Sequence, residues 1–156
     1  MRRLAFSMLP LLGVMLQGCK AAAPGRIQTK VITRAKHSLL VGNKYGRNPL
    51  TSNSRTIAEG KEAFTHYCVV CHGLDGQNTG VPFADRMDPP VPSLASPEIQ
   101  SYTDGQLKWV IDNGVAPSGM PASKQLLSDD EQWAIVVFLR HLPPVGSLGE
   151  PGIYGN

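Results

Sequence analysis

The feature that most constrains this chain is the run Cys68-Val69-Val70-Cys71-His72. A C-x-x-C-H run is the attachment signature of a covalently bound c-type haem. On a helix the cysteines lie one turn apart, so each sulfur can form a thioether with one vinyl group of the same porphyrin. The neutral imidazole of His72 is a good iron ligand, and its neighbouring tether carries it beneath the metal. The run therefore predicts one covalent haem c with His72 as the proximal ligand.

Two other interpretations of the cysteine pair are weaker. A structural zinc site takes four protein ligands, and the only other cysteine, Cys19, lies far away in a leader-like segment. A thioredoxin-like dithiol needs a βαβ context, but no apolar strand precedes the run. Chance occurrence of the five residues is the remaining alternative. The sequence also shows no nucleic-acid motif, no phosphate loop and no second C-x-x-C-H run, so we expect no nucleic-acid partner.

Met120 is the candidate for the second axial ligand. It lies within residues 113–121, where glycine and proline on both sides favour an extended loop that brings one thioether over the distal face of the haem. Met87 is the alternative, because it is the only other methionine outside the leader. It follows His72 closely and fits better as the filler of an apolar gap near the haem edge.

A wider pattern surrounds the run. It consists of Gly60, Phe64, Gly73, Gly114, Met120, Pro121 and the segment 133–140. This pattern resembles the class I (monohaem) cytochromes c of bacteria, and the match covers residues 54–143. The resemblance implies an all-α fold, a loop-rich, cytochrome c-like bundle of roughly three to five helices around one covalent haem.

The resemblance also implies the roles of individual residues. The two cysteines of the run would form the thioethers, His72 would be the proximal ligand and Met120 the distal one. The carbonyl of Pro82 would accept the other ring N–H of His72 and so fix the imidazole. Loop length varies in this family, so other prolines remain alternatives to Pro82. These are Pro89, Pro90 and Pro92.

Three capping boxes predict where helices begin, because each precedes apolar residues at helical spacing. They are Thr56-x-x-Glu59, Thr103-x-x-Gln106 and Ser128-x-x-Glu131. Residues 133–139 are all apolar, so the last helix must be covered on more than one face. We expect Ile135 and Phe138 to cross the first helix at Gly60, while Leu139 faces the porphyrin.

The N-terminus predicts export. Arg2-Arg3 and the short apolar stretch 4–16 are typical of a secretory signal rather than of a membrane span. Residues 16–19 read Leu-Gln-Gly-Cys and are typical of a lipobox, in which cleavage before Cys19 leaves a cysteine that carries acyl chains. Cleavage after Ala23 and a retained signal anchor are the alternatives. We expect a signal peptide over residues 1–18 and a lipid-anchored product on the periplasmic side of a bacterial membrane.

Charge divides the remaining chain. Residues 19–53 hold seven basic residues and no acidic one, whereas residues 54–143 hold six basic and eleven acidic residues. The first stretch is interpreted as a basic, lipid-anchored linker that suits anionic headgroups, although its residues 31–50 can instead wrap onto the domain. The second is the haem domain, whose negative charge suits a basic redox partner. Residues 144–156 are rich in glycine and predict an irregular tail.

Function follows from the expected coordination. An iron bound by both His72 and Met120 has no open position for a substrate, so we expect a carrier of single electrons and not an enzyme. Its partners would be a dehydrogenase, an oxidase or another cytochrome. One alternative is a haem subunit of a dehydrogenase or oxidase complex. Another is a peroxidase-like or gas-binding protein, which requires a displaceable Met120.

Overall fold

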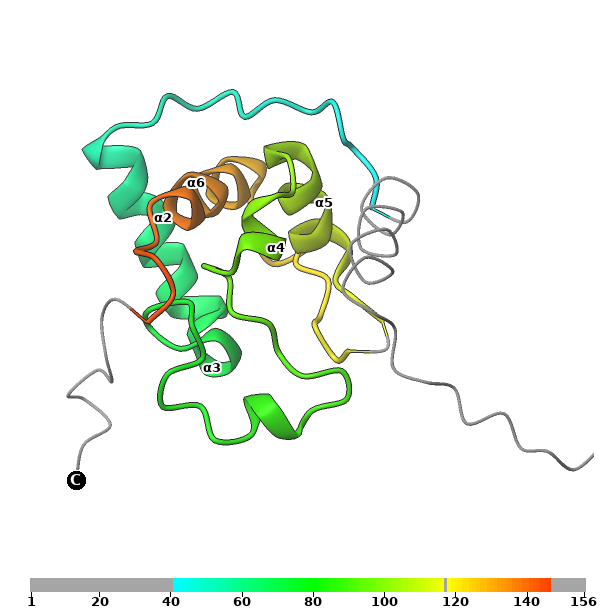
Figure 1. Cartoon of the computed structure of the whole chain (residues 1–156). Helices are drawn as coiled ribbons and strands as arrows, with labels where there is room; N and C mark the ends of the chain where they lie inside the picture. The colour runs from blue at the N-terminus through cyan, green and yellow to red at the C-terminus, as the bar shows by residue number, and fades with distance from the viewer. Residues whose placement is uncertain (1–40, 117, 147–156) are drawn as a thin grey trace, which may run out of the picture.

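The computed structural model describes residues 41–116 and 118–146, and this part of the chain is helical, with no strand (Figure 1). The helices, in chain order, are α2 (Ser54–Tyr67), α3 (Val69–His72), the one-turn 3₁₀ helix η1 (Ala84–Arg86), α4 (Pro97–Gln100), α5 (Asp104–Asn113) and α6 (Asp129–Arg140). Long loops join α3 to α4 and α5 to α6, and these loops bear on the candidate site. The all-α prediction is therefore confirmed.

Two of the three predicted helix starts are correct. Thr103 and Ser128 each cap a helix through a full capping box, with Gln106 and Glu131 as the respective third helical residues. The helix start predicted from the Thr56 box is wrong. There the helix begins earlier, at Ser54, because the side chain of Asn53 accepts a hydrogen bond from the backbone N–H of Thr56.

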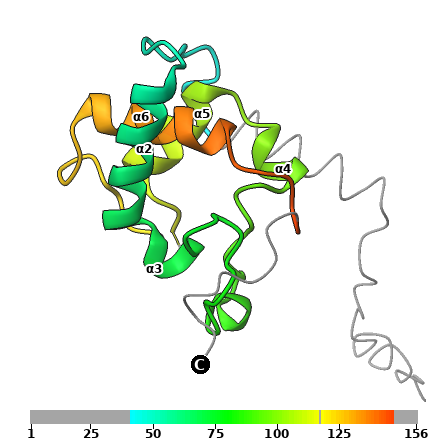
Figure 2. The ribbon, with the colours of Figure 1, turned by 90° about the vertical axis from the view of Figure 1, so that its left-hand side faces the viewer.

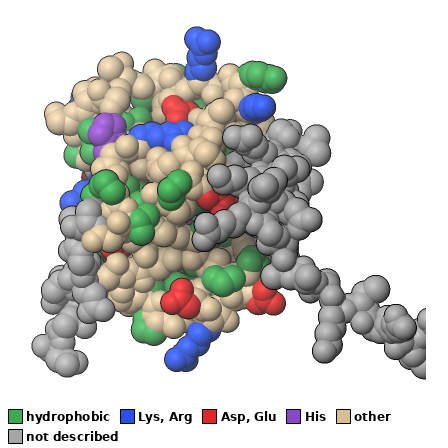
Figure 3. Space-filling view, viewed as in Figure 1, with side chains coloured by type: hydrophobic (Ala, Val, Ile, Leu, Met, Phe, Trp, Pro, Cys, Tyr) green, Lys and Arg blue, Asp and Glu red, His purple; other side chains and the backbone are tan. Residues whose placement is uncertain are grey.

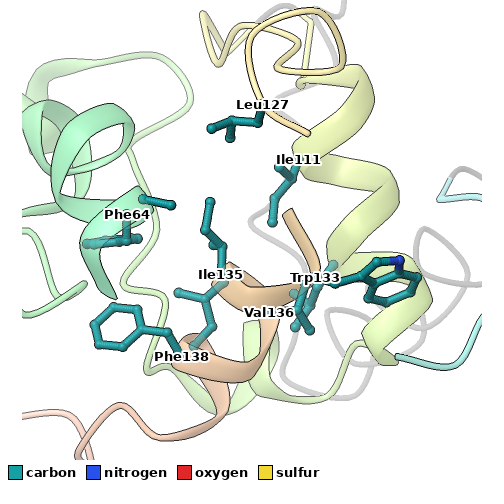
Figure 4. Packing of buried hydrophobic residues seen from close by; sticks show 10 residues of the cluster. Phe64, Ile111, Leu127, Trp133, Ile135, Val136 and Phe138 are labelled. Carbon is teal, nitrogen blue, oxygen red and sulfur yellow. The ribbon is translucent and has the colours of Figure 1, made fainter. Parts of the chain in front are cut away.

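Helix α6 forms the centre of the core. Every residue from Gln132 to Leu139 is buried, as the continuous apolar run predicts, because α6 packs against both α2 and α5. The rings of Phe64 on α2 and Phe138 on α6 lie with their centroids 5.2 Å apart. Figure 4 shows these rings together with Ile135, Ile111 and Leu127 in the cluster that joins the three helices.

Gly60 allows α2 and α6 to cross steeply and in direct contact (Figure 2). A Cβ atom placed on Gly60 would overlap the backbone carbonyl of Ala134 and would lie 3.0 Å from the Cβ of Phe138. The predicted crossing point is thus correct, as is the contact with Phe138. The closest group is the Ala134 carbonyl and not the Ile135 side chain.

Arg140 joins the end of α6 to the start of α5. Its Nε donates to Asp104 Oδ1 at 2.9 Å, and its other guanidinium nitrogens donate to the carbonyls of Gln100 and Tyr102. One planar group therefore holds α4, α5 and α6 together.

The packed part of the chain begins before α2. Thr103 Oγ1 donates to the carbonyl of Lys44 at 2.9 Å, and Asn48 Nδ2 donates to the carbonyl of Trp133 at 3.0 Å. Gly42 lies directly against the indole of Trp109. Residues 42–48 thus wrap onto α5 and α6, as the alternative interpretation of residues 31–50 allowed.

The predicted signal peptide, Cys19 and most of the linker lie outside the described residues, as does the tail from residue 147. Within the described ranges, no helix is long and apolar enough to cross a membrane.

We predict that Gly60→Leu destabilises the domain by about 3 kcal/mol or more, because the new side chain must displace the backbone of α6. Urea denaturation of the purified protein measures the change. Ala58→Leu is the matched control, since Ala58 lies exposed on the same helix and should alter the free energy of unfolding little. A Gly60→Leu protein as stable as Ala58→Leu would contradict the close crossing.

Candidate haem-binding site

The C-x-x-C-H run lies on one helical turn. α2 ends at Tyr67, Cys68 is both its C-cap and the N-cap of α3, and the backbone N–H of His72 donates to the carbonyl of Cys68 at 3.0 Å. Gly73 ends this turn with a φ of 69°. The cysteines are therefore one turn apart at the end of a helix whose other face is anchored in the core.

Both cysteines of the run are free thiols and are partly buried. Burial, and secondarily the neighbouring Cys71, raises the pKa of Cys68 to about 11, so this sulfur is a neutral thiol at pH 7. Neutral, unpaired thiols one turn apart fit a vinyl-bearing porphyrin. Within residues 41–116 and 118–146, no three His, Cys, Asp or Glu side chains gather into a group that could hold a metal ion by themselves.

The imidazole of His72 is buried on one side. Burial lowers its pKa to about 4, while the backbone carbonyl of Pro92 acts in the opposite direction. The ring is therefore neutral at pH 7, which is the form that binds iron. Its Nδ1 is buried and has no hydrogen-bond partner in this structure. Because Nδ1 is buried, Nε2 is the ring nitrogen left for a metal.

The carbonyl that acts on His72 differs from the expected one. The resemblance implied Pro82, but the group that influences the ring is the carbonyl of Pro92, one of the alternatives. Pro82 is exposed and lines a shallow surface hollow with Gln77 and Asp85. Sequence spacing could not find Pro92, because the loop between His72 and Pro92 contains the extra turn η1 and folds back on itself.

That loop is held by internal hydrogen bonds. The buried carboxylate of Asp75 accepts from the backbone N–H of Gln77 at 2.8 Å and from the hydroxyl of Thr79. The backbone N–H of Leu94 donates to the carbonyl of Gly76 at 2.7 Å. The two ends of the loop therefore meet beside α3.

Met120 lies on the loop between α5 and α6, which is also fixed by its backbone. Gly114 ends α5 with a φ of 67°, and the N–H of Val115 donates to the carbonyl of Met120 at 3.1 Å. A Cβ atom on Gly114 would overlap that same carbonyl. The loop is thus a closed turn, and the glycine allows its two arms to touch. The side chain of Met120 is partly buried.

Met87 lies against this loop. Its Cε would be 3.3 Å from a Cβ atom on Gly119, the residue before Met120. Met87 follows η1, so the loop after His72 reaches the loop that carries Met120. This contact places Met87 at the rim between the two loops, consistent with the predicted gap-filling role.

Figure 1 shows α3 and the loop that carries Met120 on opposite sides of the lower half of the molecule, with the loop that contains η1 running below them. His72 and Met120 therefore lie on two segments that are anchored separately, one by α3 and the other by the turn after α5. A C-x-x-C-H run on one helical turn, with a neutral imidazole, is the arrangement of a c-type cytochrome domain.

Residues 55–139, more than half of the chain, match the family model described as cytochrome c oxidase, cbb3-type, subunit III. The chain belongs to this family. The family implies haem c and electron transfer, and the matched residues include the C-x-x-C-H run and Met120. No curated protein matches the chain.

Two solved structures are similar to the chain. One is a chain of the reducing HAO-like protein complex Kustc0457/Kustc0458 of Kuenenia stuttgartiensis, at 25% identity and a TM-score of 0.49, covering 60% of this chain and 46% of that one. This chain thus spans less than half the length of that relative. The other is the c-type cytochrome KustC0563, at 26% identity and a TM-score of 0.43, covering 52% of this chain and 93% of that one.

We predict that Gly114→Ala loosens the Met120 loop and lowers stability by about 2 kcal/mol or more, through backbone strain and overlap with the Met120 carbonyl. Amide hydrogen exchange at Val115 should become faster. Gly146→Ala is the matched control, because Gly146 has a φ of 78° but no atom within 4 Å of its Cβ position. Equal effects of the two substitutions would contradict the closed turn.

Proposed function

We propose that this protein carries single electrons on one covalent haem c that is tethered by Cys68 and Cys71 and ligated by His72 and Met120. The observation that carries the proposal is the C-x-x-C-H run on a single helical turn, with a neutral, half-buried imidazole, in a member of a haem c family. When bound, the haem supplies a one-electron couple.

Each of the proposed site residues would have one role in holding the haem. The cysteines would tether the porphyrin at the end of α2, and His72 would bind the iron through its neutral ring. Met120, on its closed turn, would supply a thioether as the second ligand, and a thioether favours ferrous iron. Because both axial positions are then taken, a substrate has no place to bind.

Replacement of Met120 tests this ligation. In Met120→Ala we expect loss of the far-red iron–sulfur absorption of the ferric protein, a lower reduction potential and rapid binding of carbon monoxide by the ferrous protein. Met87→Ala is the matched control, since Met87 is the other methionine at this loop. It should retain the far-red absorption and resist carbon monoxide.

One result would contradict the carrier proposal, and another would contradict only the assignment of Met120. A wild-type protein that binds carbon monoxide rapidly and lacks the far-red absorption would favour the peroxidase-like or gas-binding alternative. Loss of the far-red absorption in Met87→Ala, with retention in Met120→Ala, would assign the second axial position to Met87.

A second candidate role is that of a haem subunit in a larger oxidoreductase, and the family description as an oxidase subunit favours it. The charge of the domain suits a basic partner. Asp85 and Asp88 are exposed near Phe83, which is 43% exposed, and Figure 3 shows acidic and hydrophobic side chains together at this lower end of the molecule. Stable co-purification after mild solubilisation would separate a subunit from a free carrier.

We further propose that the mature protein is held at the periplasmic side of a membrane by acyl chains on Cys19. The support is the lipobox-like sequence before Cys19 and the basic residues after it. Mass spectrometry should find a mature N-terminus at an acylated Cys19, and Cys19→Ser should release the haem protein from the membrane fraction. An unmodified Cys19, or a mature chain that begins later, would contradict the anchor.

A further inference from the structure

Asn78 is hydrogen-bonded to His72 and has an unusual backbone conformation. Its φ is 65°, a left-handed conformation that asparagine tolerates better than most residues. Its backbone N–H donates to the carbonyl of His72 at 2.9 Å. The backbone of Asn78 is therefore fixed to the residue that bears the candidate proximal ligand.

The side chain of Asn78 reaches across the loop. Its Nδ2 donates to the carbonyl of Val91 at 2.7 Å. A carbonyl can only accept, so this contact fixes the orientation of the amide, and the other atom, Oδ1, is buried without a hydrogen-bond partner. The side-chain amide of Asn78 therefore links this residue to the backbone of Val91.

Val91 immediately precedes Pro92, whose carbonyl acts on the His72 ring. Proline has no N–H, so Pro92 cannot anchor its own backbone by donating a hydrogen bond. The neighbouring groups supply the anchors. The carbonyl of Val91 accepts from Asn78, and the N–H of Leu94 donates to Gly76 at 2.7 Å. The Pro92 carbonyl lies between these two attachment points.

We propose that Asn78 is a positioning residue for the proximal ligand: by linking the backbone of His72 to that of Val91, it holds the adjacent Pro92 carbonyl where Nδ1 of His72 can donate to it. This inference rests on the proposed function, because it assumes that Nε2 binds iron. With the ring neutral and Nε2 on the metal, the hydrogen lies on Nδ1, where the carbonyl can accept it. Such a bond fixes the plane of the imidazole and makes the ring a stronger donor to iron.

The test is Asn78→Gly in the haem-loaded protein, because glycine keeps the left-handed backbone and removes only the amide. We expect the Nδ1 proton of His72, observed by NMR in the reduced state, to exchange with solvent about five- to tenfold faster. We also expect the reduction potential to rise, because a weaker donor stabilises ferric iron less. The far-red absorption from Met120 should be unchanged.

Asn78→Asp is the second variant, because aspartate also tolerates this backbone but its carboxylate cannot donate to Val91. It should accelerate the same proton exchange. Gln77→Ala is the matched control, since the Gln77 side chain contacts the backbone N–H of Gly146 and not residues 91–92. It should exchange at the wild-type rate.

Wild-type exchange and potential in Asn78→Gly, together with wild-type exchange in Asn78→Asp, would overturn the inference. Equal acceleration in Gln77→Ala would also overturn it, because the effect would then reflect general loosening of the loop. A far-red absorption in the wild-type protein separates these results from a failure of the proposed function, since it reports ligation by methionine independently of Asn78.

Discussion

The contact between Gly60 and the backbone of Ala134 determines how α2 can lie on α6, and α2 ends in the haem-binding turn. Because no side chain separates the helices, Phe64 and Phe138 meet beside the crossing and the remaining apolar residues of α6 face α2 and α5. A wider separation would move Cys68 relative to the loop after α5. The position of the C-x-x-C-H run is therefore set by the packing of two helices that are distant in the sequence.

The two sides of the candidate site depend on loops whose backbones are fixed by glycine, asparagine and proline rather than by further helices. On the side of α3, Asn78 is hydrogen-bonded through its backbone to the carbonyl of His72 and through its side chain to the carbonyl of Val91. On the other side, Gly114 closes the turn that carries Met120. A small domain can hold a large cofactor in this way, because the helices supply the core and short polar contacts set the ligands.

Much of this architecture could be predicted from the sequence, because it follows from local chemistry. The capping boxes at Thr103 and Ser128, the burial of α6 and the notch at Gly60 depend on residue type and helical spacing. Residue spacing alone was insufficient where contacts with distant residues, or with a competing residue nearby, decide the local structure. The helix start predicted at Thr56 was wrong, because the side chain of Asn53 accepts the hydrogen bond from the backbone N–H of Thr56. The carbonyl that opposes the effect of burial on the pKa of His72 belongs to Pro92, one of the alternatives to Pro82. It lies in a loop folded by bonds from Asn78 to the Val91 carbonyl and from Leu94 to the Gly76 carbonyl.

The proposed function requires that a porphyrin be covalently joined to the chain through Cys68 and Cys71. Pyridine haemochrome spectroscopy of the denatured, solvent-extracted protein measures this most directly, with the intact mass of the same sample. We predict that the pigment stays with the polypeptide, that the spectrum is that of a haem with both vinyl groups saturated, and that the mass increases by one haem. Extraction of all the pigment, with a mass equal to that of the polypeptide alone, would contradict the account.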